Sequence, residues 1–520
     1  MNANSAQILF SMGMYLVLII TVGLVVSKKS NQSTENFFLG GRSLGPWVTA
    51  MSAEASDMSG WLLMGLPGVA YWCGLSDAVW TAIGLGIGTY INWLITAKRL
   101  RHYSVVANDS ITLPDFFSNR FKEKKKVIML IAALFILVFF TVYAASCFVT
   151  FGKLFSTLFN LNYTLMMILG AIFVILYTFL GGFLAESVCD FVQGIIMIIA
   201  LVAVLTAGTL AAGGPAGVLA NINEIPGFLN FFGIATPEVT DGVQNLSATG
   251  APLFGSAAPY GFLTILSTMS WGLGYFGMPQ VLLRFMAIRK PSEVRKSRII
   301  ATVWCVISLI AAVCIGLIGR SLYPSDLLTA SGAESVFVLM STRLMPPLVA
   351  GVMMAGILAA TMSSSDSYLL IASSAVSKNV YQGIFKKDAT DKQVMTLSRI
   401  TLVIITVIGI LIALDETSII FQVVSFAWAG FGATFGPLML FSLFWKRTNR
   451  AGAIAGMVTG AGMVFLWKLV IRPIGGVFGI YELLPAFLFS CIAIVVVSLA
   501  TKRPSAEIEQ EFELARTMQD

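Results

Sequence analysis

Long apolar stretches, separated by short polar segments, cover almost the whole chain. Each stretch is close to the length of about 20 residues that an α-helix needs to cross the hydrocarbon core of a bilayer. The first covers residues 8–26. Twelve more follow at 44–72, 76–97, 127–157, 163–183, 188–212, 258–280, 299–320, 335–376, 400–415, 418–445, 451–471 and 480–501. The pattern predicts an all-α integral membrane protein with thirteen transmembrane helices.

Two of these stretches are interrupted by residues that weaken a helix. Residues 52–60 are small and polar, and residues 270–279 contain three glycines and one proline. Interrupted spans at corresponding places in two halves indicate the midplane site of a secondary transporter. The two spans are five helices apart, which predicts two inverted repeats of five helices. The expected segments are an extra first helix with its cytoplasmic loop (1–43), the first repeat (44–212), an external loop (213–257), the second repeat (258–445), two further helices (446–501) and a cytoplasmic tail (502–520).

The composition agrees with a membrane protein and excludes other classes. Only 11% of the 520 residues are charged and 57% are hydrophobic, whereas a soluble domain carries about 25% charged residues. The single histidine and six scattered cysteines give no basis for a metal centre, a Ser/His/Asp triad or a disulfide framework. We therefore expect neither an enzyme nor a bound cofactor. A phosphate-binding loop of the GxxxxGK[ST] type is also absent from the sequence.

The basic residues predict the orientation in the membrane. Most of the 33 Lys and Arg fall in alternate loops and in the tail, at 28–42, 98–126, 284–298, 378–399, 446–450 and 502–516. Basic loops stay in the cytoplasm during insertion, so the N-terminus is expected outside and the C-terminus inside. The net charge of +7 is thus a topology signal and gives no support for nucleic-acid binding. The tail, which has four glutamates between 507 and 513, is expected to form a solvated segment.

A few acidic residues lie inside or at the ends of the apolar stretches, where a charge is costly. They are Glu54, Asp57, Glu186, Asp190 and Asp366. The pattern places no lysine or arginine at the same depth in those spans, so a bound cation is the natural partner. Protonation or hydrogen bonds to neighbouring helices are the alternative. Asp57 is the strongest candidate because it lies within the interrupted stretch 52–60, where freed carbonyls can coordinate an alkali cation.

The chain resembles the solute:sodium symporters, and most closely their bacterial sodium/proline branch. The resemblance rests on ordered motifs that run from the second to the ninth predicted helix. They are Gly40-Gly-Arg-Ser-Leu-Gly-Pro46, Ala55-Ser-Asp-Met-Ser-Gly-Trp-Leu-Leu-Met-Gly-Leu-Pro67, Leu113-Pro-Asp-Phe116, Tyr177-Thr-Phe-Leu-Gly-Gly-Phe-Leu-Ala185, Trp271-Gly-Leu-Gly-Tyr-Phe-Gly277 and Met362-Ser-Ser364.

The resemblance implies a leucine-transporter-like fold in a bacterial cytoplasmic membrane and sodium-coupled uptake of L-proline by alternating access. It implies a sodium site made of the carbonyls of Ala55, Met58 and Ala360 and the hydroxyls of Ser363 and Ser364. Asp57 and Asp190 would take part in ion coupling. The implied partners are therefore Na⁺, the solute and membrane lipid, with no obligate protein partner.

The resemblance also implies a substrate pocket lined by aromatic residues. Trp61, Tyr143, Trp271 and Tyr275 would enclose the proline ring and its secondary ammonium. Backbone N–H groups at the broken helix, at Gly272 and Gly274, would receive the carboxylate.

The sequence departs from the family pattern in its extra acids. Glu54, Glu186 and Asp366 stand out as additional carboxyl groups and form a possible further ion or proton site. Met278-Pro-Gln280 changes the rim of the expected pocket. A symporter of another amino acid, a carboxylate or a sugar, driven by sodium or protons, therefore remains the alternative.

Overall fold

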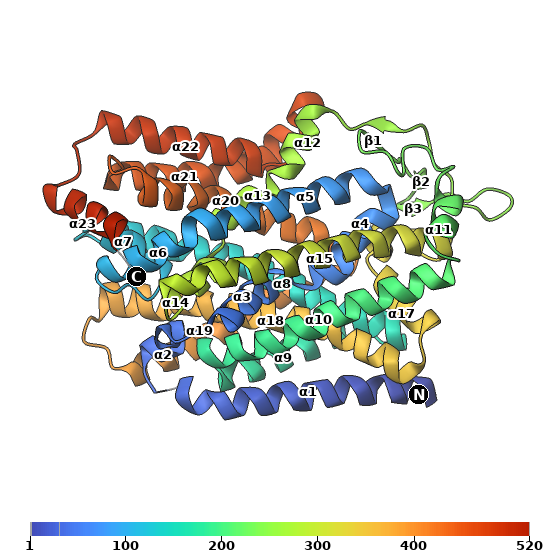
Figure 1. Ribbon diagram of the computed structural model, residues 1–520, viewed down its shortest axis with the longest axis horizontal. Helices are drawn as coiled ribbons and strands as arrows, with labels where there is room; N and C mark the ends of the chain where they lie inside the picture. The colour runs from blue at the N-terminus through green and yellow to red at the C-terminus, as the bar shows by residue number, and fades with distance from the viewer. Residues whose placement is uncertain (1–2, 31, 519–520) are drawn as a thin grey trace.

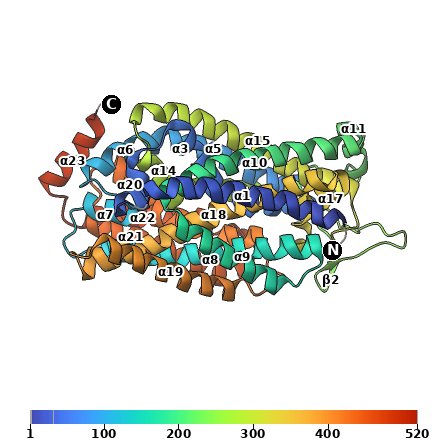
Figure 2. The same ribbon diagram turned by 90° about the horizontal axis from the view of Figure 1, so that it is seen from below.

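The computed structural model describes residues 3–30 and 32–518 and consists almost wholly of helices (Figure 1). The longest helices run along the long axis of the molecule, as both views show (Figures 1 and 2). In the described part of the chain, ten helices are long and apolar enough to cross a membrane. This confirms a multi-pass α-helical membrane protein; the count of thirteen crossings stays a prediction.

The long elements are helices that the apolar stretches predicted. Nine are α1 (Ala3–Ser30), α8 (Val127–Phe159), α10 (Phe183–Ala211), α15 (Val294–Leu322), α18 (Pro347–Ser374), α19 (Asp391–Ile412), α20 (Ile420–Phe444), α21 (Arg450–Leu466) and α22 (Leu483–Ala500). The tenth is continuous through α5 (Leu75–Ile91), the π-helical η3 (Asn92–Thr96) and α6 (Ala97–Val106). α9 (Tyr163–Leu180) is shorter but also apolar.

Both interrupted stretches are broken helices, as predicted. The first consists of α3 (Pro46–Asp57), the π-helical η2 (Trp61–Gly65) and α4 (Leu66–Cys73). The second consists of α12 (Phe262–Met269), α13 (Trp271–Gly274), η4 (Tyr275–Gly277) and α14 (Pro279–Ala287). Met278 has an extended backbone, and Pro279 then begins α14 with a φ already suited to a helix. The second broken helix therefore continues to Ala287, beyond the predicted end at residue 280.

α18 and α20 form the enclosed centre of the molecule. In each, 83% of the most apolar window is buried, compared with 33% for α1 and α21. α18 packs against α1, α3, α8 and α10. Polar side chains on α18 therefore face protein on all sides, which is the position expected for functional groups in a membrane protein.

Short elements cap the two ends of the bundle. α2 (Thr34–Leu39) and α7 (Leu113–Arg120) lie at one end. At the other end, residues 213–257 contain α11 (Pro215–Ile222) and the strands β1 (Gly233–Ile234), β2 (Val239–Thr240) and β3 (Val243–Gln244). β1 pairs with β4 (Ala258–Pro259), and β2 pairs with β3, both antiparallel. The nearby short helices are α16 (Ala330–Ala333) and α17 (Val336–Leu344).

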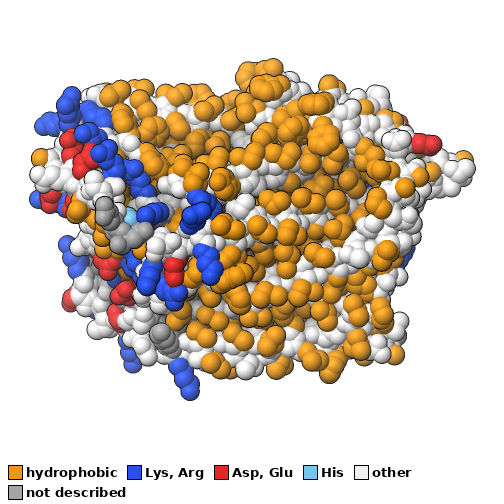
Figure 3. All heavy atoms as spheres, viewed as in Figure 1, with side chains coloured by type: hydrophobic (Ala, Val, Ile, Leu, Met, Phe, Trp, Pro, Cys, Tyr) orange, Lys and Arg blue, Asp and Glu red, His pale blue; other side chains and the backbone are white. Residues whose placement is uncertain are grey.

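Charged residues gather at one end of the molecule, beside a broad apolar surface (Figure 3). We call this the basic end; it carries the C-terminal segment, while α1 begins at the opposite end (Figure 1). We call the opposite end, formed by residues 213–257, the loop end. The surface pattern agrees with the sorting of Lys and Arg in the sequence.

The tail has a feature that the sequence did not predict, because its glutamates belong to a docked helix. α23 (Ala506–Thr517) packs against α6. The Phe512 ring is buried, and its centroid lies 6.2 Å from that of Tyr103. The guanidinium groups of Arg99 and Arg120 lie 5.1 and 5.4 Å from the same ring. An apolar contact and two cation–π contacts therefore hold the helix, and the sequence pattern of the tail alone could not reveal these partners.

Ion pairs strengthen the docking of α23. Lys122 Nζ lies 2.5 Å from Glu511 Oε1 and 3.0 Å from Glu507 Oε1. The hydrogen bond to Glu511 raises the pKa of Lys122, so this lysine stays protonated at neutral pH. The pairs are partly exposed to solvent and add little to stability by themselves.

Replacing Phe512 by alanine is expected to release α23 from the basic end. The change removes the one large side chain that the helix buries there, and large-to-small changes at buried positions cost about 3–5 kcal/mol. We expect a protease to cleave the tail of Phe512→Ala about tenfold faster or more. Leu514→Ala is the matched control, because the Leu514 side chain is 56% exposed. Equal cleavage rates for both variants would contradict the docking described.

Candidate functional site

The break after α3 frees a backbone carbonyl in the centre of the molecule. Met58 N donates to Glu54 O at 2.8 Å, but Ser59 N donates to Asp57 O at 3.0 Å. In a continuous helix, Ser59 N would have bonded to Ala55 O. The Ala55 carbonyl is thus released from the helix at the place where the sequence predicted it.

Hydroxyl groups of α18 meet this carbonyl. Ser363 Oγ donates to Ala55 O at 2.8 Å, and Ser364 Oγ lies 3.4 Å from the same oxygen. Ser363 Oγ also lies 3.2 Å from Ala360 O. Both serines are fully buried. The structure therefore brings together four of the five predicted sodium ligands in direct contact, and Met58 lies at the break beside them. Oxygen atoms of this kind suit a hard cation.

Asp57 places a carboxylate at the same break. Its side chain is only 4% exposed. Asp57 Oδ1 accepts a hydrogen bond from Gln280 Nε2 of α14 at 3.3 Å, and the Tyr275 hydroxyl lies nearby. No lysine or arginine pairs with Asp57 among the described residues. The carboxyl group links the two broken helices and has no basic partner among the described residues, so a bound cation could balance its negative charge.

An aromatic layer lies on the loop-end side of this break. The Trp271 ring centroid lies 5.5 Å from Trp61, 5.3 Å from Phe421 and 5.3 Å from Tyr481. Trp428 Nε1 donates to Trp271 O at 2.8 Å. The predicted pair Trp61 and Trp271 is therefore in contact, within a larger layer than the motifs showed.

On the side of this layer that faces away from the break, a cavity opens at the loop end. It has a volume of about 630 Å³, and Trp271, Phe421 and Tyr481 line it. Asp77 and Arg472 also line it. The aromatic layer thus separates an open vestibule from the break in α3.

The other two predicted aromatic residues lie beside the break. The Tyr143 ring stacks on Tyr368 of α18 at a centroid distance of 4.2 Å. Tyr275 contacts Trp428 edge-to-face at 5.1 Å. Both tyrosines are buried. All four predicted aromatic residues therefore surround the same region.

The two predicted glycines allow α13 to approach its neighbours closely. A Cβ atom on Gly272 would lie 2.2 Å from Gly84 O of α5, and one on Gly274 would lie 2.0 Å from Trp428 Nε1. Only glycine fits these contacts. Their role in receiving a carboxylate stays a prediction.

Arg284 corrects the expectation that the buried acids have no basic partner. It lies on α14, fully buried, where the sequence suggested a basic loop. Arg284 Nη2 pairs with Glu186 and, at 3.1 Å, with Asp190 Oδ2. The reason is that the second broken helix restarts at Pro279 and carries Arg284 into the interior.

Serine hydroxyls extend this cluster to two further helices. Ser52 Oγ of α3 donates to Asp190 Oδ2 at 2.7 Å, and Ser367 Oγ of α18 donates to Glu186. Together with Arg284, Glu186 and Asp190, these serines form a set that we call the inner network. It joins α3, α10, α14 and α18 on the basic-end side of the break.

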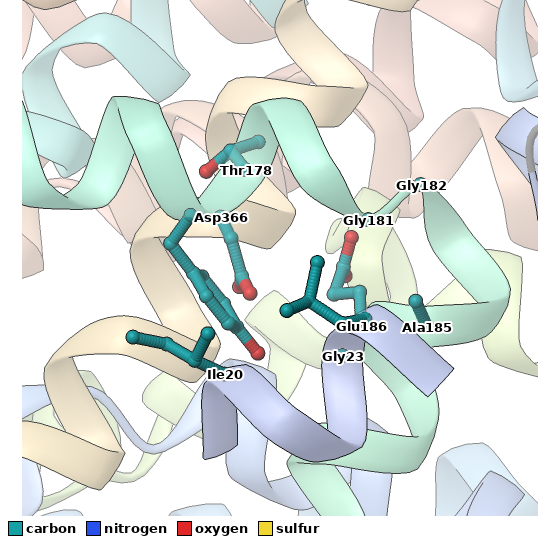
Figure 4. Close-up of a pocket in the computed structure, with 10 residues that line it drawn as sticks. Ile20, Gly23, Thr178, Gly181, Gly182, Ala185, Glu186 and Asp366 are labelled. Atoms are coloured by element: carbon teal, nitrogen blue, oxygen red, sulfur yellow. The ribbon is translucent and has the colours of Figure 1, made fainter. Parts of the chain in front are cut away.

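Two of the three additional acids share a small pocket. Glu186 and Asp366 line it together with Ile20, Thr178 and Gly182 (Figure 4). The pocket has room for about one water molecule. Glu186 Oε2 and Asp366 Oδ2 have no hydrogen-bond partner among the described residues. These two carboxyl groups could therefore bind an ion or a proton.

Glu54 lies apart from that pocket. Glu54 Oε1 accepts a hydrogen bond of 3.4 Å from Trp93 Nε1 of η3. Its neighbour on the same helix is Asp57. The structure therefore divides the predicted additional site into a pair, Glu186 and Asp366, and a separate buried acid.

Comparison with known proteins decides the family. A sequence model of the sodium:solute symporter family matches residues 37–460. The chain is a member of the sodium:solute symporter family. The symporter is 41% identical over 516 residues to the sodium/proline symporters of Staphylococcus aureus strains COL and JH9. The match covers 98% of this chain and 96% of each relative. Membership in a family of transporters confirms that the protein is not an enzyme.

Solved structures confirm the fold of this symporter. A Na⁺-coupled sialic acid symporter in a substrate-bound outward-open state superposes with a TM-score of 0.75, at 18% identity, covering 96% of this chain and 99% of that one. MhsT in complex with L-phenylalanine superposes with a TM-score of 0.50, at 17% identity, covering 88% and 98%. The predicted leucine-transporter-like architecture is therefore confirmed at the level of the fold.

Sequence reasoning missed a buried ion pair that supports the aromatic layer of this symporter. Lys153 Nζ lies 2.7 Å from Glu334 Oε2. Glu334 also accepts hydrogen bonds of 2.9 Å from the backbone N–H groups of Ile420 and Phe421 at the start of α20. This arrangement holds Phe421 in place on the loop-end side of the break. The only sequence signal was an isolated lysine in the long apolar stretch of α8.

Proposed function

We propose that this symporter couples the entry of Na⁺ to the uptake of L-proline by alternating access. The observation that carries the proposal is the Ala55 carbonyl, which the break in α3 frees and which the hydroxyls of Ser363 and Ser364 meet. The names of the relatives, sodium/proline symporters at 41% identity, support proline as the solute.

Na⁺ would bind between α3 and α18. The carbonyls of Ala55, Met58 and Ala360 and the hydroxyls of Ser363 and Ser364 would supply the oxygens. Asp57, linked through Gln280 to α14, would attract the ion and fix the broken ends relative to each other. Ion binding would therefore order the region next to the solute.

Proline would bind among Trp61, Tyr143, Trp271 and Tyr275. Aromatic faces suit its apolar ring and attract its secondary ammonium. The broken end of α13, with Gly272 and Gly274, would supply N–H groups to the carboxylate. The vestibule at the loop end gives the solute a route to the aromatic layer.

The basic end would face the cytoplasm of a bacterial cell, with the N-terminus outside and the C-terminus inside. The vestibule then opens to the exterior, and the inner network closes the path toward the cytoplasm. In this proposal, residues 44–212 and 258–445 are the inverted repeats that move against each other. Release of Na⁺ requires the inner network to open, which gives Asp190 a role in the exit of the ion.

Uptake by the purified protein in liposomes tests the function. We expect proline to accumulate with an inward Na⁺ gradient, and we expect excess proline to compete better than other amino acids, carboxylates or sugars. Stronger competition by another solute would identify that solute, in place of proline, as the substrate. Uptake that does not saturate, or current without solute, would indicate a channel.

The pocket between Glu186 and Asp366 supports a second ion or proton in the cycle. We expect Asp366→Asn to lower the number of cations that enter with each proline, because the change removes the carboxyl group of this pocket that forms no ion pair among the described residues. Parallel measurement of cation and proline fluxes would give this ratio. Glu54→Gln is the matched control, since Glu54 lies outside the pocket. An unchanged ratio in Asp366→Asn would assign the pocket a structural role.

A further inference from the structure

A groove lies at the basic end, between the start of α21 and the segment that leads to α23. Its volume is about 750 Å³. Arg450 lies at the start of α21, and Lys502 and Arg503 lie on the facing segment. The groove is remote from the ion and solute sites, and neither the family nor the relatives' names assign it a ligand.

The segment that carries two of the basic residues is held in place. Asn449 Nδ2 donates to Thr501 Oγ1 at 2.7 Å and to Lys502 O at 2.8 Å. Arg447 Nη2 donates to Thr501 O at 2.8 Å. Asn449 also caps α21 through Gly452 N. The same side chain thus fixes the start of α21 and the backbone beside Lys502.

The charge in this groove is mostly unbalanced. Arg450 Nε pairs with Glu123 at 2.7 Å. Lys502 and Arg503 are exposed and form no ion pair with any other residue in ranges 3–30 and 32–518. Three cationic groups therefore face one carboxylate, and the remaining positive charge favours the binding of an anion.

The wall of the groove is apolar and continues toward the membrane. Ile454, Ala455 and Val458 form one side, and Ile508 of α23 lies on the other. Val458 is 49% exposed and lies about 12 Å further along α21 than Arg450. A ligand that fits must combine an anionic head with a hydrocarbon chain.

We propose that this groove binds an anionic phospholipid, with its phosphate near Arg450, Lys502 and Arg503 and an acyl chain along Ile454 and Val458. Basic pockets beside transmembrane helices are suited to such headgroups. A free phosphate would satisfy the charges but leave the apolar wall uncovered. Because Ile508 belongs to α23, the lipid would also contact the docked tail helix.

Binding of fluorescent dioleoyl phosphatidylglycerol to the full chain in detergent tests the proposal. We expect the double variant Lys502→Gln/Arg503→Gln to bind this lipid about tenfold more weakly. The control Lys124→Gln/Lys125→Gln makes the same charge change at the same end, on exposed residues outside the groove. It should bind like the unmodified chain. Ala455→Trp, which fills the apolar wall and keeps every charge, should also weaken binding.

Competitors separate this lipid from other ligands of the same charge. Excess inorganic phosphate should not displace the labelled phosphatidylglycerol, and dioleoyl phosphatidylcholine should compete poorly. Displacement by phosphate, equal competition by phosphatidylcholine, or equal loss of binding in the two double variants would each overturn the proposal. The test needs no transport, so its failure would leave the sodium and proline assignment untouched.

Discussion

Replacing Ser363 by alanine is expected to raise the Na⁺ concentration needed for half-maximal uptake by about tenfold or more. A polar contact to a charged group contributes about 1.5–3 kcal/mol, and 1.4 kcal/mol corresponds to a factor of ten. Ser363 Oγ lies 2.8 Å from Ala55 O, so its loss removes one of the proposed ligands and a contact between α3 and α18. The measurement is initial proline uptake against Na⁺ concentration in liposomes.

Ser365→Ala is the matched control for this result. Ser365 is equally buried on the same helix, but its hydroxyl donates to Thr361 O at 2.7 Å within α18. We expect its Na⁺ dependence to stay close to that of the unmodified protein. An equal change in both variants would show that hydroxyls of α18 act by packing, and would contradict the ion site.

Asp57→Asn should have a larger effect in the same assay. The amide keeps the shape of the side chain but removes the charge that balances the ion in a buried site. We expect uptake to fall to near background at Na⁺ concentrations that saturate the unmodified protein. A variant that keeps normal Na⁺ dependence would remove Asp57 from ion coupling.

Replacing Arg284 by alanine is expected to lower the free energy of unfolding by about 3–5 kcal/mol, because it leaves buried carboxylates without their partner. Arg284 is fully buried and pairs with Glu186 and Asp190. Denaturant unfolding of the purified protein in detergent measures the effect. Uptake should be lost as well, since the inner network joins four helices.

An exposed arginine of the same region provides the control for this change. Arg289 is 53% exposed and pairs with Glu293, so Arg289→Ala should cost at most about 1 kcal/mol. Neutralising the acids together with the arginine, in Arg284→Met with Glu186→Gln and Asp190→Asn, should restore much of the stability but no transport. If Arg284→Ala were as stable as Arg289→Ala, the inner network would not be a buried ion pair.

The break in the helix around Asp57 was predictable because its signal is local. Small polar residues around Asp57 interrupt an apolar helix, and such a break has only a few stable outcomes in a membrane. The serines of α18 were found for the same reason, since hydroxyls in an enclosed helix need partners. The resemblance to the family then implied that these two helices, α3 and α18, meet at the ion site.

The inner network and the tail were not predictable because their partners are distant in sequence. Arg284 resembles the basic loop residues that follow it, and only the restart of the helix at Pro279 carries it inside. Phe512 is an isolated aromatic residue among glutamates, and its contacts come from α6 and α7. The ion-pair partners Lys153 and Glu334 likewise lie in segments that are distant from each other in the sequence.

The most direct test of the central claim is movement of sodium driven by proline. In sealed liposomes with equal Na⁺ on both sides, an inward proline gradient should drive accumulation of radioactive sodium by the unmodified protein. Ser363→Ala should show little accumulation under the same conditions. Proline entry without accompanying sodium in the unmodified protein would contradict coupled transport through this site.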